Sequence, residues 1–135
     1  LTVFALIGFP FTSNNTAVHA KDLEPRIGQK LATQMMSELF PSGIAQDKTV
    51  FYSPAFYGVP LKVDHFDPAR HRNLDLSTSL YVKTGDIILW DTDTPLHFDG
   101  LTLQQVEAQK QFRLLRSYSE TADGKTYELY VFEVM

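Results

Sequence analysis

The residue types best suited to chemistry cluster directly after an apolar run near the middle of the chain. The run Ile87–Trp90 is followed by carboxylate, hydroxyl and imidazole groups at Asp91, Asp93, Thr94, His97 and Asp99. A buried strand that delivers acids at its carboxyl end is where open α/β sheets place ligand sites. An ordinary strand also surfaces into a polar loop in this way, so a structural interpretation stays open.

Asp91-Thr92-Asp93 has the Asp-x-Asp form with which nucleotide-sugar glycosyltransferases hold a divalent cation and its diphosphate. Two hard carboxylates on one turn suit Mg²⁺ or Mn²⁺, and such a metal offsets the charge of the leaving group. The sequence has no Gly-rich phosphate loop and no basic diphosphate clamp beside the pair. Metal-dependent glycosyl transfer, with Asp91 and Asp93 as the metal ligands, is therefore the alternative function, and the leading interpretation has no cofactor.

A second acidic cluster lies in the segment Asp64–Asp67 (DHFD). Joined with His97 and Asp99, its imidazole and carboxylates could form a metal site, although no two histidines have the spacing of a helical zinc motif. The alternative is that Asp67-Pro68 caps a short helix over His65–Arg72. Trp90 could stack on a sugar ring, but its apolar neighbours favour the core. The candidate ligand-binding residues are Asp64, His65, Asp67, Trp90, Asp91, Asp93, His97 and Asp99.

Composition excludes several classes of function. The chain has 135 residues, no cysteine and a formal net charge of −4. The lack of cysteine excludes disulfides, thiolate zinc sites and a cysteine nucleophile. The negative charge and the lack of a Lys/Arg run argue against nucleic acid as a partner. The densest basic patch, Arg70–Arg72, is predicted to lie on a solvated face. No Gly-x-Ser-x-Gly elbow supports a serine hydrolase.

The elements that must position these residues begin with a helix from Glu24, where Pro25 suits the first turn. Apolar residues at spacing four define its buried stripe: Ile27, Leu31, Met35 and Leu39. Residues 49–53 form a short strand, and residues 54–61 form an irregular or short helical turn. Before the helix, Leu1–Phe9 is either a strand or the end of a membrane helix, and a polar arm extends from it to residue 23.

The second half of the chain gives stronger signals. Ile87–Asp91 is an unbroken apolar strand, which predicts burial on both faces. Thr102–Gln105 has capping-box form and begins a helix that reaches about Lys110. Residues 112–119 and 127–134 alternate as strands around Asp123-Gly124, a strong hairpin signal. The sequence therefore predicts one α/β domain over residues 24–135, with a mixed sheet of four to five strands, two to three packed helices and a C-terminal hairpin.

A family resemblance rests on the segment Lys83–Asp91 (KTGDIILWD). It resembles the "P-G-D-x-hydrophobic-x-W-D" signature of a group of bacterial polytopic membrane proteins of the glycosyltransferase-like, mannosyltransferase-like type. The chain departs from this signature in having Lys83-Thr84 where a proline is expected and Thr92–Thr94 where small and aromatic residues usually follow. Other stretches resemble the family in the same order: Val50–Pro54, Val63–Pro68, Phe112–Tyr118 and Tyr130–Glu133.

The resemblance implies that this chain is the soluble C-terminal extracytoplasmic domain of such a membrane protein, on the periplasmic face of the bacterial inner membrane. Catalysis would belong to the membrane-embedded part, and this domain would be a non-catalytic accessory or binding module. Its implied partners are the membrane-embedded part of the same polypeptide and a glycan or lipid-linked sugar. Asp86 and Asp91 would anchor the turn and the loop at the two ends of the buried strand.

Overall fold

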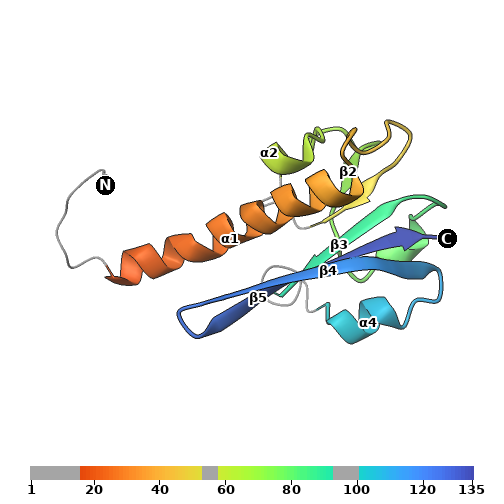
Figure 1. Ribbon diagram of the computed structural model, residues 1–135. Helices are drawn as coiled ribbons and strands as arrows, with labels where there is room; N and C mark the ends of the chain where they lie inside the picture. Colours follow the sequence, from red (N-terminus) through yellow and green to blue (C-terminus); the bar gives the residue numbers. More distant parts are fainter. Residues whose placement is uncertain (1–15, 53–57, 93–100) are drawn as a thin grey trace.

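Strand β3 (Ile87–Asp91) lies in the middle of a five-stranded mixed sheet in the computed structural model (Figure 1). The structure describes residues 16–52, 58–92 and 101–135, with side chains over 27–52, 60–92 and 101–135. The strand order is β2-β1-β3-β5-β4. β2, β1 and β3 are parallel, whereas β3, β5 and β4 are antiparallel. The other strands are β1 (Val50–Phe51), β2 (His71–Arg72), β4 (Phe112–Ala122) and β5 (Lys125–Val134). The predicted α/β domain with a mixed sheet and a C-terminal hairpin is confirmed.

Both faces of the sheet are covered, which explains why every residue of β3 is buried. Helices α1 (Thr16–Leu39) and α2 (Gly58–Leu61) pack on one face, and α4 (Leu103–Glu107) packs on the other (Figure 1). The core under α1 includes Leu31, Met35, Val50, Ile87, Leu89, Leu129 and Val131. The core under α4 consists of Phe51, Leu74, Ile88, Trp90, Leu101, Val106, Phe132 and Val134. The prediction that this strand is buried on both faces is therefore confirmed.

The two connections between the parallel strands run over opposite faces. The chain leaves β1 through α2, and Leu61 and Val63 join the core under α1. It leaves β2 through Leu74, which joins the core under α4, and continues through the 3₁₀ helix η1 (Thr78–Leu80). Because β1 lies between β2 and β3, the strand order reverses between β1 and β3. Open α/β sheets bind ligands outside the carboxyl ends of the strands at such a switch point.

Helix α1 carries the predicted apolar stripe but begins at Thr16 rather than at Glu24. Ile27, Leu31 and Met35 are buried as expected. Residues 16–23, which were predicted to be part of the polar arm, are therefore helical. The sequence did not predict this part of the helix because helical turns without regularly spaced apolar residues give no periodic signal. The predicted strand or membrane-helix end at Leu1–Phe9 lies outside the described residues.

None of the helices in the described part of the chain has the length and the apolar character that a membrane span requires.

The C-terminal half follows the local signals in the sequence. Thr102 forms the predicted capping box with Gln105, and α4 ends at Glu107, somewhat before the predicted Lys110. Asp123 and Gly124 have φ of 52° and 75°, which is the backbone conformation of the type I′ hairpin turn. A register shift between Leu114 and Arg116 interrupts the ladder of β4 and β5.

The short helix predicted over His65–Arg72 is wrong. The Asp67 carboxylate accepts the N–H of Ala69 at 3.0 Å, the bond by which an N-cap residue begins a helical turn. Only one turn forms, since Arg70 and His71 both donate to the Asp67 carbonyl oxygen. The chain then extends as β2. The carbonyl oxygens of Arg70, just before this strand, and of Arg72, at its end, accept the N–H groups of Val50 and Tyr52.

Candidate functional site

The predicted site at the end of β3 is only partly within the described residues. Trp90 is 4% exposed, and its indole N–H donates to the Leu101 carbonyl oxygen at 2.9 Å. Its ring also lies edge-on to Tyr130, with 6.0 Å between the centroids. Trp90 is therefore a core residue that fastens the chain before α4, and its faces are not open to a sugar.

Asp91 is fully buried on the α1 side of the sheet, in register with Leu129 of β5. The other predicted members of this cluster, Asp93, His97 and Asp99, lie outside the described residues. No group of three potential ligands for a metal ion occurs among the residues that the structure describes. The metal-ligand role of Asp91 and Asp93 stays a prediction.

In the acidic cluster of residues 64–67, the described contacts of both carboxylates form turns. The Asp64 carboxylate accepts the N–H of Phe66, and the Asp67 carboxylate accepts that of Ala69, each at 3.0 Å. These are Asx-turns, in which an aspartate oxygen replaces a backbone acceptor. The carboxylates thus shape the connection into β2, which is the structural interpretation of this motif.

His65 is exposed and packs its ring on Phe66, with 4.1 Å between the centroids. His71 lies further inside the same loop. Its Nδ1 lies 3.1 Å from the His65 carbonyl oxygen, and its Nε2 lies 3.1 Å from that of Tyr52. The His71 imidazole therefore links the turn before β2 to the end of β1.

A crevice not predicted from the sequence lies at the carboxyl ends of β1 and β2, beside the switch point of the sheet between β1 and β3. Its volume is about 320 Å³. Phe51 of β1 and Arg72 of β2 contribute to it, together with the segment that leads to η1. We call it the switch-point crevice, defined by Phe51, Arg72, Asn73, Asp75, Ser77 and Tyr81.

The wall of the switch-point crevice is held by local hydrogen bonds. The Asp75 Oδ1 atom accepts both the backbone N–H of Ser77 at 2.8 Å and its hydroxyl at 2.6 Å. The Asp75 N–H donates to the Thr78 hydroxyl oxygen at 2.9 Å, and Thr78 is buried. The polar side chains of this wall are therefore positioned before any ligand arrives.

Arg72 and Tyr81 form the most distinctive contact of the crevice. The guanidinium carbon of Arg72 lies 4.1 Å from the centroid of the Tyr81 ring, within the range of a cation–π interaction. Among the described residues, Arg72, the Asn73 amide and the Tyr81 hydroxyl have no hydrogen-bond partner for their side chains. The hydrogen-bonding groups of these three side chains are therefore available to a ligand.

The opposite ends of the same strands are closed by buried charges. Asp86, which is 1% exposed, accepts the N–H groups of Thr49 and Lys83 at 3.0 and 2.9 Å. It also receives the Lys83 ammonium at 2.6 Å. The predicted turn-anchoring role of Asp86 is thus visible in its contacts.

Arg70 is buried beside this anchor, although the sequence predicted that the basic patch 70–72 lies on a solvated face. Its guanidinium donates to the carbonyl oxygens of Ala45 and Lys48, both at 2.6 Å, and of Ile44 at 3.2 Å. The prediction is wrong for Arg70 because three backbone acceptors compensate for its lost hydration. It is right for Arg72, which is exposed.

Sequence reasoning missed the crevice because its residues carry only turn signals. Asp75-Leu76-Ser77 has the form of an Asx-turn, which indicates a loop and not a site. Arg72 and Tyr81 meet because β2 places the start of that loop beside its end.

Comparisons with protein-family models, with curated proteins and with solved structures gave no match to this chain.

Proposed function

We propose that this chain is a non-catalytic, extracytoplasmic binding domain of a glycosyltransferase-like integral membrane protein, and that it binds a glycan in the switch-point crevice. The observation that carries the proposal is the crevice itself. It lies at the carboxyl ends of β1 and β2, beside the switch point at which open α/β sheets bind ligands, and it combines a tyrosine side chain that is exposed with guanidinium, amide and carboxylate groups.

The chemistry of these groups matches that of a sugar. Tyr81 offers a hydroxyl and the part of its ring that the Arg72 guanidinium does not cover, whereas Arg72 and Asn73 offer several N–H donors in planar groups. The second oxygen of Asp75 has no hydrogen-bond partner among the described residues and can accept from a ligand hydroxyl. Because the wall is already ordered, binding costs little conformational entropy.

The assignment to a membrane protein is supported by the resemblance of Lys83–Asp91 to the family signature. The structure gives a physical reason for part of that signature. Gly85 has φ of +92°, a conformation that favours glycine, and the buried Asp86 carboxylate holds the turn to β1. Gly85 and Asp86 together set the start of β3.

The glycan site is tested by saturation-transfer NMR with glucose, galactose, mannose and N-acetylglucosamine as probes. We expect transfer to at least one sugar, and an affinity about fivefold to tenfold weaker in Arg72→Ala or Asn73→Ala, since each loses one or two hydrogen bonds. Arg113→Ala is the matched control, because Arg113 is also an exposed arginine but pairs with Glu133 on β4. No transfer to any sugar, or equal affinity in all three variants, contradicts the proposal.

The membrane assignment is tested separately by reading the coding DNA in frame upstream of Leu1. Several apolar stretches of about 20 residues support it, because each is long enough to cross a bilayer. A start codon or a cleavable signal sequence directly upstream contradicts it.

A further inference from the structure

Strand β4 forms an open edge of the sheet (Figure 1). It is the last strand in the order β2-β1-β3-β5-β4, and within the described part of the chain it pairs only with β5. β4 has 11 residues, whereas β2 at the opposite edge has two. A long edge strand presents a row of unpaired backbone N–H and C=O groups, to which another strand can be added.

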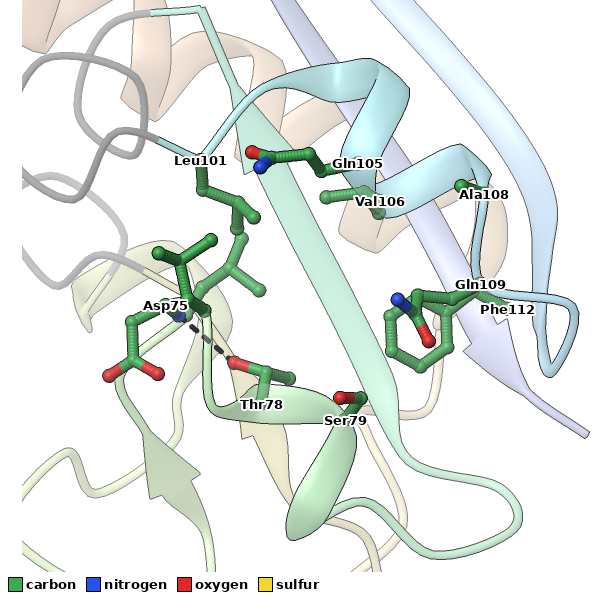
Figure 2. Close-up of a pocket in the computed structure, with 11 residues that line it drawn as sticks. Asp75, Thr78, Ser79, Leu101, Gln105, Val106, Ala108, Gln109 and Phe112 are labelled. Carbon is green, nitrogen blue, oxygen red and sulfur yellow. Dashed lines mark hydrogen bonds between the residues drawn. The ribbon is translucent and has the colours of Figure 1, made fainter.

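The part of β4 that is suited to pairing begins after its bulge. Phe112, at the start of the strand, packs against the core under α4 and lines the cavity between η1 and α4 (Figure 2). The register shift between Leu114 and Arg116 separates this start from the rest of β4. From Arg116 to Ala122 the ladder with β5 is regular. This second part of β4 therefore has the straight geometry that a partner strand requires.

The contacts of β5 show which backbone groups of β4 face outward. The N–H of Glu128 donates to the Thr92 hydroxyl at 3.0 Å, and its carbonyl oxygen accepts the Thr92 N–H at 3.1 Å. The backbone of Glu128 is thus turned toward β3, and Glu128 is the partner of Ser119 in the β4–β5 ladder. Because bonded and non-bonded pairs alternate along an antiparallel ladder, the N–H and C=O groups of Ser119 and Ser117 point away from β5, to the open edge.

The side chains on the α1 face of this part of β4 carry opposite charges. Arg116 pairs with Glu38 of α1, and Glu120 pairs with Lys30 of α1, each at 2.6 Å. Tyr118 lies midway between the arginine and the glutamate along the strand and is buried on the same face. A strand that has a positive and a negative residue at equal spacing from its centre is complementary to a second copy of itself that runs antiparallel.

We infer that two copies of this chain associate through β4, antiparallel to each other about a two-fold axis at Tyr118, so that their two sheets become one. Arg116 then lies opposite Glu120 of the second copy, and the reverse pair forms on the other side of the axis. Ser117 exchanges backbone hydrogen bonds with Ser119 of the second copy, since the groups of both residues face outward. Opposite charges across such a pair stabilise it.

The charges select this register over its neighbours. The outward-facing backbone groups can meet only in registers that differ by an even number of residues. A shift by two residues in either direction loses both ion pairs between the copies. A shift by four residues places Arg116 opposite Arg116 of the second copy in one direction, and Glu120 opposite Glu120 in the other. Like charges directly opposite each other are destabilising.

The interface leaves the proposed glycan site free. β4 and β2 are the two opposite edges of the sheet, and the switch-point crevice lies at β1 and β2. Association of two copies and binding of a sugar therefore have separate outcomes.

The experiment is sedimentation equilibrium of the domain at concentrations up to about 1 mM, because a single strand pair buries less area than a stable dimer interface and associates weakly. We expect the mass to rise with concentration from 15.3 kDa toward twice that value. Arg116→Glu and Glu120→Arg each place like charges opposite each other at both pairs, and we expect each variant alone to associate about tenfold more weakly. Lys110→Glu is the matched control, because it makes the same change of charge as Arg116→Glu at an exposed position outside β4.

An equimolar mixture of the two β4 variants is the decisive sample. In a mixed dimer one chain carries two acidic groups and the other two basic groups, so opposite charges again face each other at both pairs. We expect association to return to the level of the parent protein. Both variants lose an ion pair with α1, and mixing does not restore that pair, so a recovery reports on the interface and not on the folding of each chain.

The absence of cysteine from the chain permits an independent test of the register. Ser117 and Ser119 are exposed and lie opposite each other in the proposed dimer, within the distance that a disulfide spans. We expect a mixture of Ser117→Cys and Ser119→Cys to form a cross-linked dimer under mild oxidation faster than either variant alone, because equal positions of the two copies are too far apart.

Each of the other outcomes overturns the inference. The protein remains a monomer at every concentration, or it forms a dimer that neither charge reversal weakens, in which case another surface is used. A mixture that stays as dissociated as its separate components, or Ser117→Cys alone cross-linking as fast as the mixture, excludes the two-fold register at Tyr118. None of these results depends on sugar binding, so the proposed function is tested separately.

Discussion

The two ends of the three parallel strands differ in how their polar groups are used. At the amino ends, Asp86 and Arg70 are buried and direct their charged groups to hydrogen-bond partners within the chain. At the carboxyl ends, Arg72 and Asn73 are exposed and keep their side-chain donors available. Buried charges are tolerated only when they are paired, so the amino ends form a scaffold. The carboxyl ends retain hydrogen-bonding capacity for a ligand.

This difference predicts where substitutions affect stability and where they affect binding. A residue whose polar atoms are all satisfied inside the protein contributes to the free energy of unfolding when it is removed. A residue whose donors face solvent contributes little to the free energy of unfolding, and its removal weakens only the binding of a ligand. The four predictions below test this division, from the largest expected effect to the smallest.

Asp86→Ala has the largest expected effect. It leaves the N–H of the buried Thr49 and that of the exposed Lys83 without their acceptor, and a buried unpaired group costs about 1–3 kcal/mol. We expect the free energy of unfolding to fall by about 2–4 kcal/mol, measured by urea denaturation. Asp86→Asn retains an acceptor oxygen and is expected to cost less. A loss below about 0.5 kcal/mol in the alanine variant, the range of ordinary surface substitutions, contradicts the scaffold role.

Arg70 and Arg72 lie at the two ends of β2, so the amino and carboxyl ends can be compared at a single strand. Arg70→Met leaves the carbonyl oxygens of Ile44 and Lys48 without a donor, whereas that of Ala45 keeps the Lys48 N–H, and the variant is expected to destabilise the protein by about 2–3 kcal/mol. Arg72→Met removes an exposed side chain and is expected to change stability by less than about 0.5 kcal/mol. Chemical denaturation of the two variants measures both values. Equal effects would mean that the two ends of the sheet do not differ in this way.

Asp91 and Asp93 separate the structural from the metal-binding interpretation of the Asp-x-Asp pair. Because Asp91 is fully buried, Asp91→Asn is expected to reduce stability by about 1–2 kcal/mol, and Asp93→Asn is expected to leave it unchanged. A thermal-shift titration with Mn²⁺, Mg²⁺ and Zn²⁺ completes the test. Metal-dependent stabilisation that both substitutions abolish would support the enzymatic alternative and contradict ours.

The smallest expected effect concerns pH. The hydrogen bond from Arg113 is the main cause that lowers the pKa of Glu133, and the bond from Gln34 is the main cause that lowers the pKa of Glu38. Both carboxylates therefore stabilise the fold above their unfolded pKa, near 4.5, and this stabilisation is lost as the pH falls through their lowered folded pKa. Denaturation between pH 6 and pH 3 should show a shallower loss in Glu38→Gln/Glu133→Gln than in the parent protein. An identical loss contradicts the assignment.

The elements with strong local signals could be predicted from the sequence. The apolar run of β3, the capping box at Thr102 and the turn at Asp123-Gly124 each form from contacts within a few residues. β1 lies within the strand predicted over residues 49–53, although it contains only two residues. β2 is equally short, and it was not predicted because its pairing with β1 depends on the buried Arg70 and on no periodic pattern in the sequence.

The candidate site was harder to predict for the same reason. Clustered acidic residues are usual candidates for a ligand site, yet Asp64 and Asp67 form turns and Asp91 is buried. The crevice depends on Arg72 reaching Tyr81, a contact that requires the fold around β2 to exist. Local sequence identifies which groups are reactive, whereas the register of the strands decides which of them share a cavity.

The most direct test of the central claim is a titration of the ¹⁵N-labelled domain with glucose, galactose, mannose and N-acetylglucosamine in turn, followed by amide chemical shifts. We predict that the largest changes in amide chemical shift occur at Arg72, Asn73, Asp75 and Tyr81. The amide signals of Thr49, Arg70 and Asp86 are expected to stay unchanged. Shifts confined to the amino ends of the strands, or an absence of shifts with all four sugars, would contradict the claim that the carboxyl ends form the binding site.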